Sequence, residues 1–150
     1  MTVFADCSFV TALFRVQANT EAAENFRANF HEALPITDLL RYEFEQSVRH
    51  HMFRHRHDRT TGYAEGEGIA MLVEFEQQVV SGSLSLVAVD WTAWCEKARV
   101  LSERHTVASG HRAFDIPHVA AALVYGARQL LTFDTNQRKL ARAEGLAVPL

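Results

Sequence analysis

Short apolar runs alternate with longer amphipathic stretches along the whole sequence. The apolar runs predict buried strands at residues 2–6, 34–36, 84–89 and 130–133, with a last edge strand at 146–148. Between them, apolar side chains recur every three or four positions, as in Leu40, Phe44 and Val48, which is the period of a helix packed on a core. Helices are therefore predicted around residues 9–14, 20–30, 38–48, 69–79, 91–101, 117–123 and 136–143, with a polar loop at 58–68.

This order of elements predicts the fold class. Successive strands that are joined by a helical crossover run parallel, whereas a tight hairpin joins antiparallel strands. The sequence therefore predicts an α/β protein with three layers, α/β/α, around a central and mostly parallel sheet of four to five strands. The 150 residues show no internal repeat and no low-complexity linker, so a single domain over residues 1–150 is expected.

Four acidic residues stand beside these apolar runs. Asp6 ends the first predicted strand, Asp134 follows the fourth, and Asp115 opens the apolar stretch after Gly110. Glu43 lies one position off the inner stripe of its predicted helix, at the edge of the core. Since the carboxyl ends of parallel strands share one edge, where open α/β sheets bind ligands, we expect the four carboxylates to face one another across a crevice.

Such a group of acids has a chemical consequence. Two unit charges about 4 Å apart repel by roughly 4 kcal/mol at an effective dielectric constant near 20. The carboxyl groups would then hold protons at raised pKa values or bind a cation, and oxygen-only ligands favour Mg2+ or Mn2+. For each acid taken singly, a helix cap or a surface charge is the simpler interpretation. That interpretation is strongest for Asp115 and Asp134, which precede predicted helices.

The segments that carry these acids together resemble the PIN-domain family. Val3-Phe4-Ala5-Asp6-Cys7-Ser8 is similar to the Asp-x-Ser after the first strand of that family, and Leu131-Thr132-Phe133-Asp134 is similar to its Thr-x-Asp. Glu43 within residues 39–44 and Asp115 within residues 110–122 resemble its other two acidic segments. The resemblance covers nearly the whole chain in the right order and is strongest to the small VapC-type toxins of prokaryotic toxin–antitoxin pairs. Cys7, where Thr or Ser is common, and the His- and Arg-rich insertion at 49–67 depart from the family.

The resemblance implies a fold, an activity, a cofactor and partners. The fold would be a PIN-like version of the layered sheet, and the activity would be metal-dependent hydrolysis of RNA by an endoribonuclease. The cofactor would be Mg2+ or Mn2+, carried by Asp6, Asp115 and Asp134, with Glu43 orienting the attacking water or helping to bind a second ion. The partners would be an RNA substrate, a cognate antitoxin protein and a second copy of the chain in a homodimer, with DNA contacted only through the antitoxin.

Other residues near the acids could assist this chemistry. The hydroxyl groups of Ser8 and Thr132 could hydrogen-bond Asp6 and Asp134 and fix the rotamers of the carboxylates. Helix capping by Ser8 and the ordinary strand preference of Thr132 explain the same residues equally well. The candidates for contact with RNA phosphates are Arg49, Arg54, Arg112 and His118, each of which also has a structural interpretation.

Composition narrows the remaining possibilities. Apolar residues make up 48% of the chain and the net charge is −3, so a globular protein is expected and any nucleic-acid contact must use a local patch. No apolar run approaches the ~20 residues that span a bilayer, and the N-terminus lacks a signal-peptide pattern, so a cytoplasmic location without membrane contact is expected. Cys7 and Cys95 are expected to be reduced, and His51 and His55, at helical spacing, lack a third zinc ligand.

Two other functions remain open at this point. One is a non-catalytic PIN-like module that binds nucleic acid or protein and retains the acidic pocket. The other is a phospho-receiver domain, in which Asp90 after the third predicted strand would be the phosphorylation site. The receiver interpretation ranks below the others because the chain lacks paired acids after the first strand and a lysine after the fifth.

Overall fold

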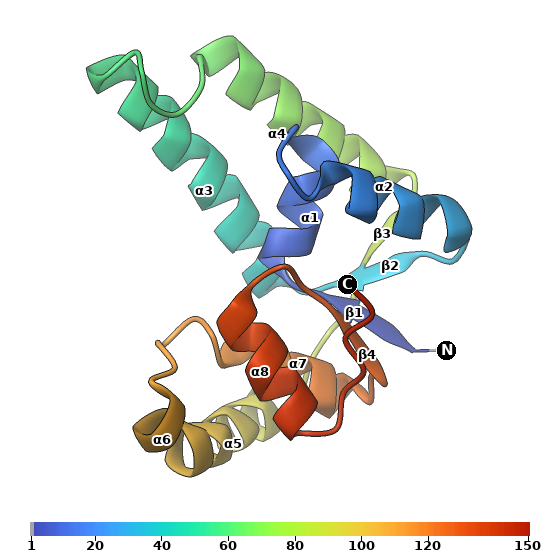
Figure 1. Ribbon diagram of the computed structural model, residues 1–150. Coiled ribbons are helices and arrows are strands. Elements are labelled where there is room, and N and C mark those ends of the chain that lie inside the picture. The colour runs from blue at the N-terminus through green and yellow to red at the C-terminus, as the bar shows by residue number, and fades with distance from the viewer. Residues whose placement is uncertain (1) are drawn as a thin grey trace.

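The computed structural model describes residues 2–150 and shows helices arranged around two small sheets (Figure 1). Strand β1 (Val3–Ala5) pairs with β4 (Gln129–Leu131), and β2 (Leu34–Ile36) pairs with β3 (Leu84–Leu86), in parallel in both cases. The helices are α1 (Cys7–Phe14), α2 (Thr20–Asn29), α3 (Asp38–His57), α4 (Glu65–Val80), α5 (Trp91–Leu101), α6 (Val107–Ser109), α7 (Pro117–Tyr125) and α8 (Thr135–Ala143), and a π-helical turn (Ser102–Thr106) leads from α5 into α6.

The predicted PIN-like three-layer fold with a central sheet of four to five strands is wrong. Helices contain 61% of the chain. The four strands of residues 2–150 have three residues each and form two separate two-stranded sheets. The strand predicted at 84–89 ends at Leu86, and the edge strand predicted at 146–148 is reduced to one bridge between Ala147 and Gln129.

A proline explains why the two sheets do not merge. β1 and β2 lie side by side, yet no ladder of hydrogen bonds joins them within the described chain. In β2, Leu34 donates its N–H to Ser83, and Ile36 accepts from Val87, so both residues turn their backbone groups toward β3. The residue between them, Pro35, is the one whose backbone turns toward β1, and it carries no N–H to donate.

The helices on the two sides of the strands enclose two apolar cores. One core lies among β1, β2, α1, α3 and α4, where the rings of Phe44 and Phe75 stack with their centroids 4.6 Å apart. The other lies among β4, α5, α7 and α8, around Phe4, Leu101 and Leu140. Figure 1 shows these two groups of helices on opposite sides of the strands. The carboxyl ends of β1 and β4 therefore lie between the two cores.

Helices α3 and α4 form a pair that extends away from the strands (Figure 1). Their connection is shorter than the loop predicted at 58–68, because α4 already begins at Glu65. Gly62 in this connection has a φ of +65°, and a Cβ there would lie 2.0 Å from the carbonyl oxygen of His51. The connection therefore requires glycine at this point, and it places the ring of Tyr63 in a stack on His51.

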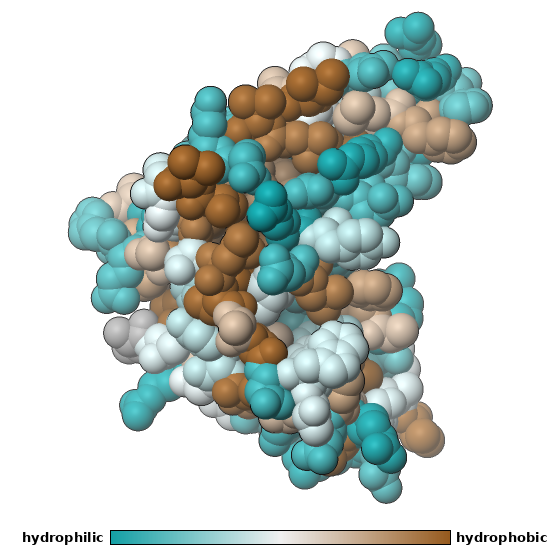
Figure 2. Space-filling view, turned by 180° about the vertical axis from the view of Figure 1, so that it is seen from behind, coloured by the Kyte–Doolittle hydropathy of each residue, from teal (hydrophilic) through white to brown (hydrophobic). Residues whose placement is uncertain are grey.

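Part of the apolar surface stays exposed on α4. Ile69 and Val73 are each 50% exposed, and Val80 is 80% exposed. Figure 2 shows apolar side chains gathered in a band over the side of the molecule where α4 lies. A separate finding is that none of the helices within residues 2–150 is both long and apolar enough to cross a membrane.

Candidate functional site

Asp6 is the most unusual side chain of the structure, because it is fully buried although it is acidic. It follows β1 and caps α1, with its Oδ1 accepting the N–H of Phe9 at 3.0 Å. The Ser8 hydroxyl donates to the same Oδ1 at 2.7 Å, and the Thr132 hydroxyl donates to Oδ2 at 2.6 Å. Burial raises the pKa of Asp6, and these three hydrogen bonds and the charge of His118 partly offset that rise.

Ser8 and Thr132 connect the ends of β1 and β4. The Ser8 oxygen accepts the N–H of Phe133 at 2.8 Å, and the Thr132 oxygen accepts the N–H of Asp134 at 3.0 Å. Both hydroxyls thus donate to Asp6 while they accept from the chain that follows β4. Asp6 itself, rather than Ser8, caps α1, and Thr132 contacts the backbone of Asp134 rather than its carboxylate.

Glu43 is held by a histidine from the other core. It lies on α3, and its Oε2 is 2.5 Å from Nε2 of His118 on α7. The side chain of His118 is fully buried, whereas that of Glu43 is 30% exposed. The ring of His118 therefore faces the carboxylate of Glu43 and not the surface, and its contact with RNA stays a prediction.

Cys7 lies between the two acids just described. Burial is the main reason why the pKa of its thiol is far above the ordinary value, and the charges of Glu43 and Asp6 raise it further. The thiol is therefore protonated at neutral pH and is not a nucleophile. Cys95 is also a free thiol in the structure.

The other two predicted acids are engaged in local hydrogen bonds. Oδ1 of Asp134 caps α8 by accepting the N–H groups of Asn136 and Gln137 at 2.8 and 2.9 Å. Asp115 is 3% exposed, accepts the N–H of Arg112 at 2.7 Å, and has its other oxygen 3.6 Å from the guanidinium of the same arginine. Asp115 thus closes the turn before α7, three residues ahead of His118.

A cleft of about 410 Å³ opens above these groups. Glu43 and Asp134 line it, as does Ser8, whose hydroxyl donates to the buried Asp6. The structure therefore brings Asp6, Glu43 and Asp134 to one region, while Asp115 is not among the described residues that line the cleft. The full lining is Cys7, Ser8, Thr11, Arg15, Gln17, Asn19, Glu43, His51, Phe133, Asp134 and Gln137.

The acids fit a hard divalent cation by their chemistry but do not form a finished cage. Within residues 2–150, no group of three or more His, Cys, Asp or Glu side chains is arranged to hold a metal ion. Mg2+ keeps several waters and is commonly bound by one or two carboxylates together with substrate phosphates, so an incomplete protein cage is compatible with it. The assignment of Asp6, Glu43, Asp115 and Asp134 as metal ligands stays a prediction.

The arginines predicted to contact RNA lie at the surface. Arg49 forms an ion pair with Glu45 at 3.1 Å on the same helix, and Arg54 is exposed further along α3. Arg112 is 77% exposed and lies near Asp115. Their contact with RNA stays a prediction. Arg15 and His51, by contrast, line the acidic cleft itself. His51 lies in the cationic run of residues 49–59, whereas Arg15 has no counterpart in the sequence-based predictions for RNA contact.

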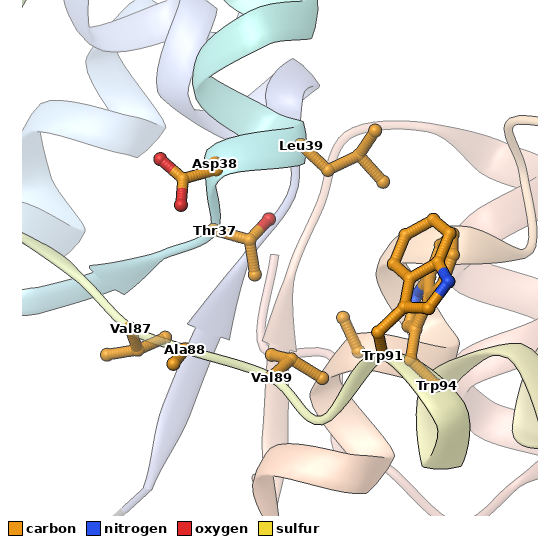
Figure 3. A pocket seen from close by; sticks show the side chains of 9 residues that line it. Thr37, Asp38, Leu39, Val87, Ala88, Val89, Trp91 and Trp94 are labelled. Atoms are coloured by element: carbon orange, nitrogen blue, oxygen red, sulfur yellow. The ribbon is translucent and has the colours of Figure 1, made fainter.

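A second cavity, of about 270 Å³, has a different character (Figure 3). It lies between the start of α3 and the segment from Val87 to α5, and its walls are mostly apolar. Figure 3 shows Trp91 and Trp94 close together on one side and Thr37 and Asp38 across from them. With Asp38 as its one acid among the described residues, this cavity lacks the groups that phosphodiester hydrolysis needs.

The acid of the receiver interpretation and the histidine pair of α3 both have structural partners. The carboxylate of Asp90 caps α5 by accepting the N–H of Ala93 at 2.7 Å. His55 bonds to the carbonyl of Thr61 through Nδ1 at 3.1 Å, and His51 stacks on Tyr63. Comparison of the sequence with models of known protein families and with curated proteins finds no match in either case.

Proposed function

We propose that this protein is a metal-dependent endoribonuclease that hydrolyses phosphodiester bonds in RNA, with acidic segments that resemble those of PIN-domain nucleases although its sheets differ from the PIN-like fold. The observation that carries the proposal is the buried carboxylate of Asp6, which accepts hydrogen bonds from the hydroxyl groups of Ser8 and Thr132 at the ends of two strands. Ser8 in turn lines the cleft that contains Glu43 and Asp134. Burying an ionisable group with a raised pKa costs stability, and such groups concentrate at functional sites. Capping α1 does not require it, because exposed Asp90 caps α5 in the same way.

Each residue of the site has its own role in the proposed reaction. Asp6, Asp115 and Asp134 would hold Mg2+ or Mn2+ together with Glu43, and the bound cation would supply an activated water and polarise the phosphoryl oxygen. Ser8 and Thr132 fix the rotamer of Asp6, as outer groups do for metal ligands. Glu43, partly exposed in the cleft and held from behind by His118, is placed to orient the attacking water.

The incomplete cage has a consequence for substrate binding. If the phosphate of the RNA supplies the missing oxygen ligands, cation and RNA should bind cooperatively. Without the cation and the RNA, the carboxylates would stay apart, because each accepts hydrogen bonds from its own donors in the protein. This agrees with the separate hydrogen bonds of Asp6, Asp115 and Asp134.

The resemblance of the acidic segments to VapC-type toxins supports the proposal that the protein is a toxin of a toxin–antitoxin pair, acting in the cytoplasm as a homodimer. An arginine of the antitoxin would fit the partly exposed acids Glu43 and Asp134 in the cleft, since arginine and carboxylate pair bidentately. The exposed apolar side chains of α4 supply a surface for a second copy. DNA would be contacted only through the antitoxin.

One observation favours a second function, that of a non-catalytic module that binds nucleic acid or protein. Each of the predicted acids already has a protein partner, and no ready cation group is found in the part of the chain that the structure describes. This module would bind its ligand in the same cleft and would not cleave RNA.

The test compares two carboxylates that both cap helices. Purified wild type, Asp6→Asn and Asp90→Asn are incubated with structured and single-stranded RNA in Mg2+, Mn2+ or chelator. We expect metal-dependent cleavage by wild type and Asp90→Asn, and none by Asp6→Asn. Equal cleavage by Asp6→Asn and wild type would refute the nuclease assignment at this site, and binding of RNA without any cleavage would favour the non-catalytic module.

A further inference from the structure

Arg15 stands in the acidic cleft without an acidic partner. It lines the same cleft as Glu43 and Asp134, and no carboxylate of the described residues lies within 4.0 Å of its guanidinium. Its side chain is partly buried, and the guanidinium carbon lies 5.2 Å from the centre of the Tyr63 ring. A partly buried arginine that stacks on an aromatic ring and pairs with no acid keeps its N–H donors available for a ligand.

The position of this arginine is fixed from both sides. Arg15 ends α1, with its N–H bonded to the carbonyl of Thr11 at 2.9 Å and its carbonyl accepting the hydroxyl of Thr20 at 3.0 Å. Tyr63 is fixed in turn by its stack on His51, with the ring centroids 5.1 Å apart. The backbone of Arg15 is therefore fixed and the Tyr63 ring restrains the guanidinium on one side, which lowers the entropy lost when it binds an anion.

His51 adds a polar group to the same wall of the cleft. It lies two turns beyond Glu43 on α3, about 12 Å along the helix axis. Its burial and the nearby charge of Arg15 lower the pKa of His51, which favours the neutral ring. Nδ1 of this ring is buried without a hydrogen-bond partner, so Nε2 is the atom that can meet a ligand. The cleft thus has an acidic wall, which needs a cation to accept phosphate, and a cationic wall, which does not.

We propose that Arg15 binds a phosphate of the RNA strand next to the phosphate that is cut, with His51 beside it. The inference rests on the proposed ribonuclease function and deepens it by naming where the strand runs: from the acids over α1 toward the connection of α3 and α4. The guanidinium would pair with two phosphate oxygens, the geometry for which arginine is suited. Because this contact needs no metal, it contributes to RNA binding in the presence of chelator.

The experiment measures metal-free binding of a fluorescent single-stranded RNA by anisotropy over a range of KCl concentrations. The parent is Asp6→Asn, in which we expect no cleavage, and Arg15→Gln, Arg15→Lys or Arg99→Gln is added to it. Arg99 is an exposed arginine of α5 outside the cleft, so its variant controls for loss of one positive charge. Thermal unfolding of each variant checks the fold.

We expect Arg15→Gln to weaken binding by about tenfold or more and Arg99→Gln to weaken it far less. The slope of log K against log salt should fall by about 0.7 for Arg15→Gln, which corresponds to one phosphate contact with a single strand. Arg15→Lys should keep the slope and lose affinity severalfold, because an ammonium group cannot pair bidentately. If Arg15→Gln does not fold, the comparison of the RNA affinity of Arg15→Lys with that of the parent tests the inference.

Arg15→Gln binding no weaker than Arg99→Gln, or Arg15→Lys binding as tightly as the parent, would overturn the inference. Its failure is distinct from failure of the proposed function. Metal-dependent cleavage by the wild type with no effect of Arg15 would leave the nuclease and remove the phosphate contact. Arg15-dependent RNA binding without cleavage would leave the contact and remove the nuclease.

Discussion

Nε2 of His118 on α7 lies 2.5 Å from Oε2 of Glu43 on α3, and this contact joins the two halves of the protein at the candidate site. We expect His118→Leu to lower the free energy of unfolding by about 1–3 kcal/mol, because a charge-assisted hydrogen bond is lost. Activity on RNA should fall by about 10- to 100-fold, since Glu43 is no longer oriented. Cleavage rates and urea unfolding measure the two effects.

His118→Gln is the matched variant, because its amide nitrogen can take the place of Nε2. It should recover part of the activity at a stability close to that of the wild type. Full activity in His118→Leu would show that Glu43 needs no partner and that the contact is only structural.

The buried carboxylate of Asp6 makes stability depend on pH in a defined direction. Because the pKa of Asp6 is raised in the folded state, the folded chain binds more protons than the unfolded chain between the ordinary aspartate pKa of about 4 and that raised value. The contribution of Asp6 to stability therefore falls as pH rises through this window. Asp6→Asn lacks this ionisable group, so the free energy of unfolding of the variant relative to that of the wild type should increase from pH 4 to neutral pH.

Chemical denaturation of both proteins across this pH range gives the difference directly. A difference that stays constant with pH would mean that the hydrogen bonds of Ser8, Phe9 and Thr132 cancel the cost of burial. The difference, rather than the wild-type curve alone, is the useful quantity, because Glu45 and Glu144 have lowered pKa values and act in the opposite direction.

Thr132→Val tests the hydroxyl that connects β4 to Asp6. The valine has nearly the same shape but donates nothing to Oδ2 of Asp6 and accepts nothing from the N–H of Asp134. We expect a loss of about 1–3 kcal/mol in the free energy of unfolding in the wild-type background. The loss should be smaller in the Asp6→Asn background, where no buried charge remains, and additive losses in a double-mutant cycle would contradict this coupling.

Cation binding should depend on RNA. Calorimetric titration of Mg2+ into the wild type should show affinity that is roughly tenfold higher with a bound non-hydrolysable RNA analogue than without it. The reason is that phosphate oxygens complete a ligand set that the protein leaves incomplete. Equal affinities with and without RNA would indicate a site formed by the protein alone.

Gly62 tests whether the connection of α3 and α4 supports the cleft. Gly62→Ala places a Cβ 2.0 Å from the carbonyl oxygen of His51, whereas Gly82→Ala, also at positive φ, meets nothing within 4 Å. The Gly82 variant should cost about 1–2 kcal/mol from backbone strain alone, and the Gly62 variant should cost roughly 1–3 kcal/mol more. Equal losses, measured by urea unfolding, would show that the connection shifts freely.

The apolar pattern of the sequence located most elements but not their assembly. The stripe of Leu40, Phe44 and Val48 lies in α3 and is buried, as its spacing predicts. The prediction of one central sheet was wrong, because apolar runs indicate where strands lie but not which strands are joined by hydrogen bonds. Pro35 is compatible with a short strand, but it has no N–H group. It therefore lacks the donor that a continuous sheet would need beside β1.

The candidate site was predictable to the extent that it depends on strand ends. Asp6 and Asp134 follow β1 and β4, and the pairing of these strands brings Ser8 and Thr132 to the carboxylate of Asp6. Arg15 has no such signal, because its place beside the acids depends on how the connection of α3 and α4 folds back over α1. Tertiary packing of this kind leaves no periodic trace in the sequence.

Metal-dependent cleavage of RNA, followed by chemical mapping of the new ends, tests the central claim most directly. The account predicts that purified wild type cuts internal phosphodiester bonds in Mg2+ or Mn2+, leaves a 3′-hydroxyl and a 5′-phosphate, and stops in chelator. Cleavage that persists in chelator, or an RNA that stays intact with every divalent cation tried, would contradict it.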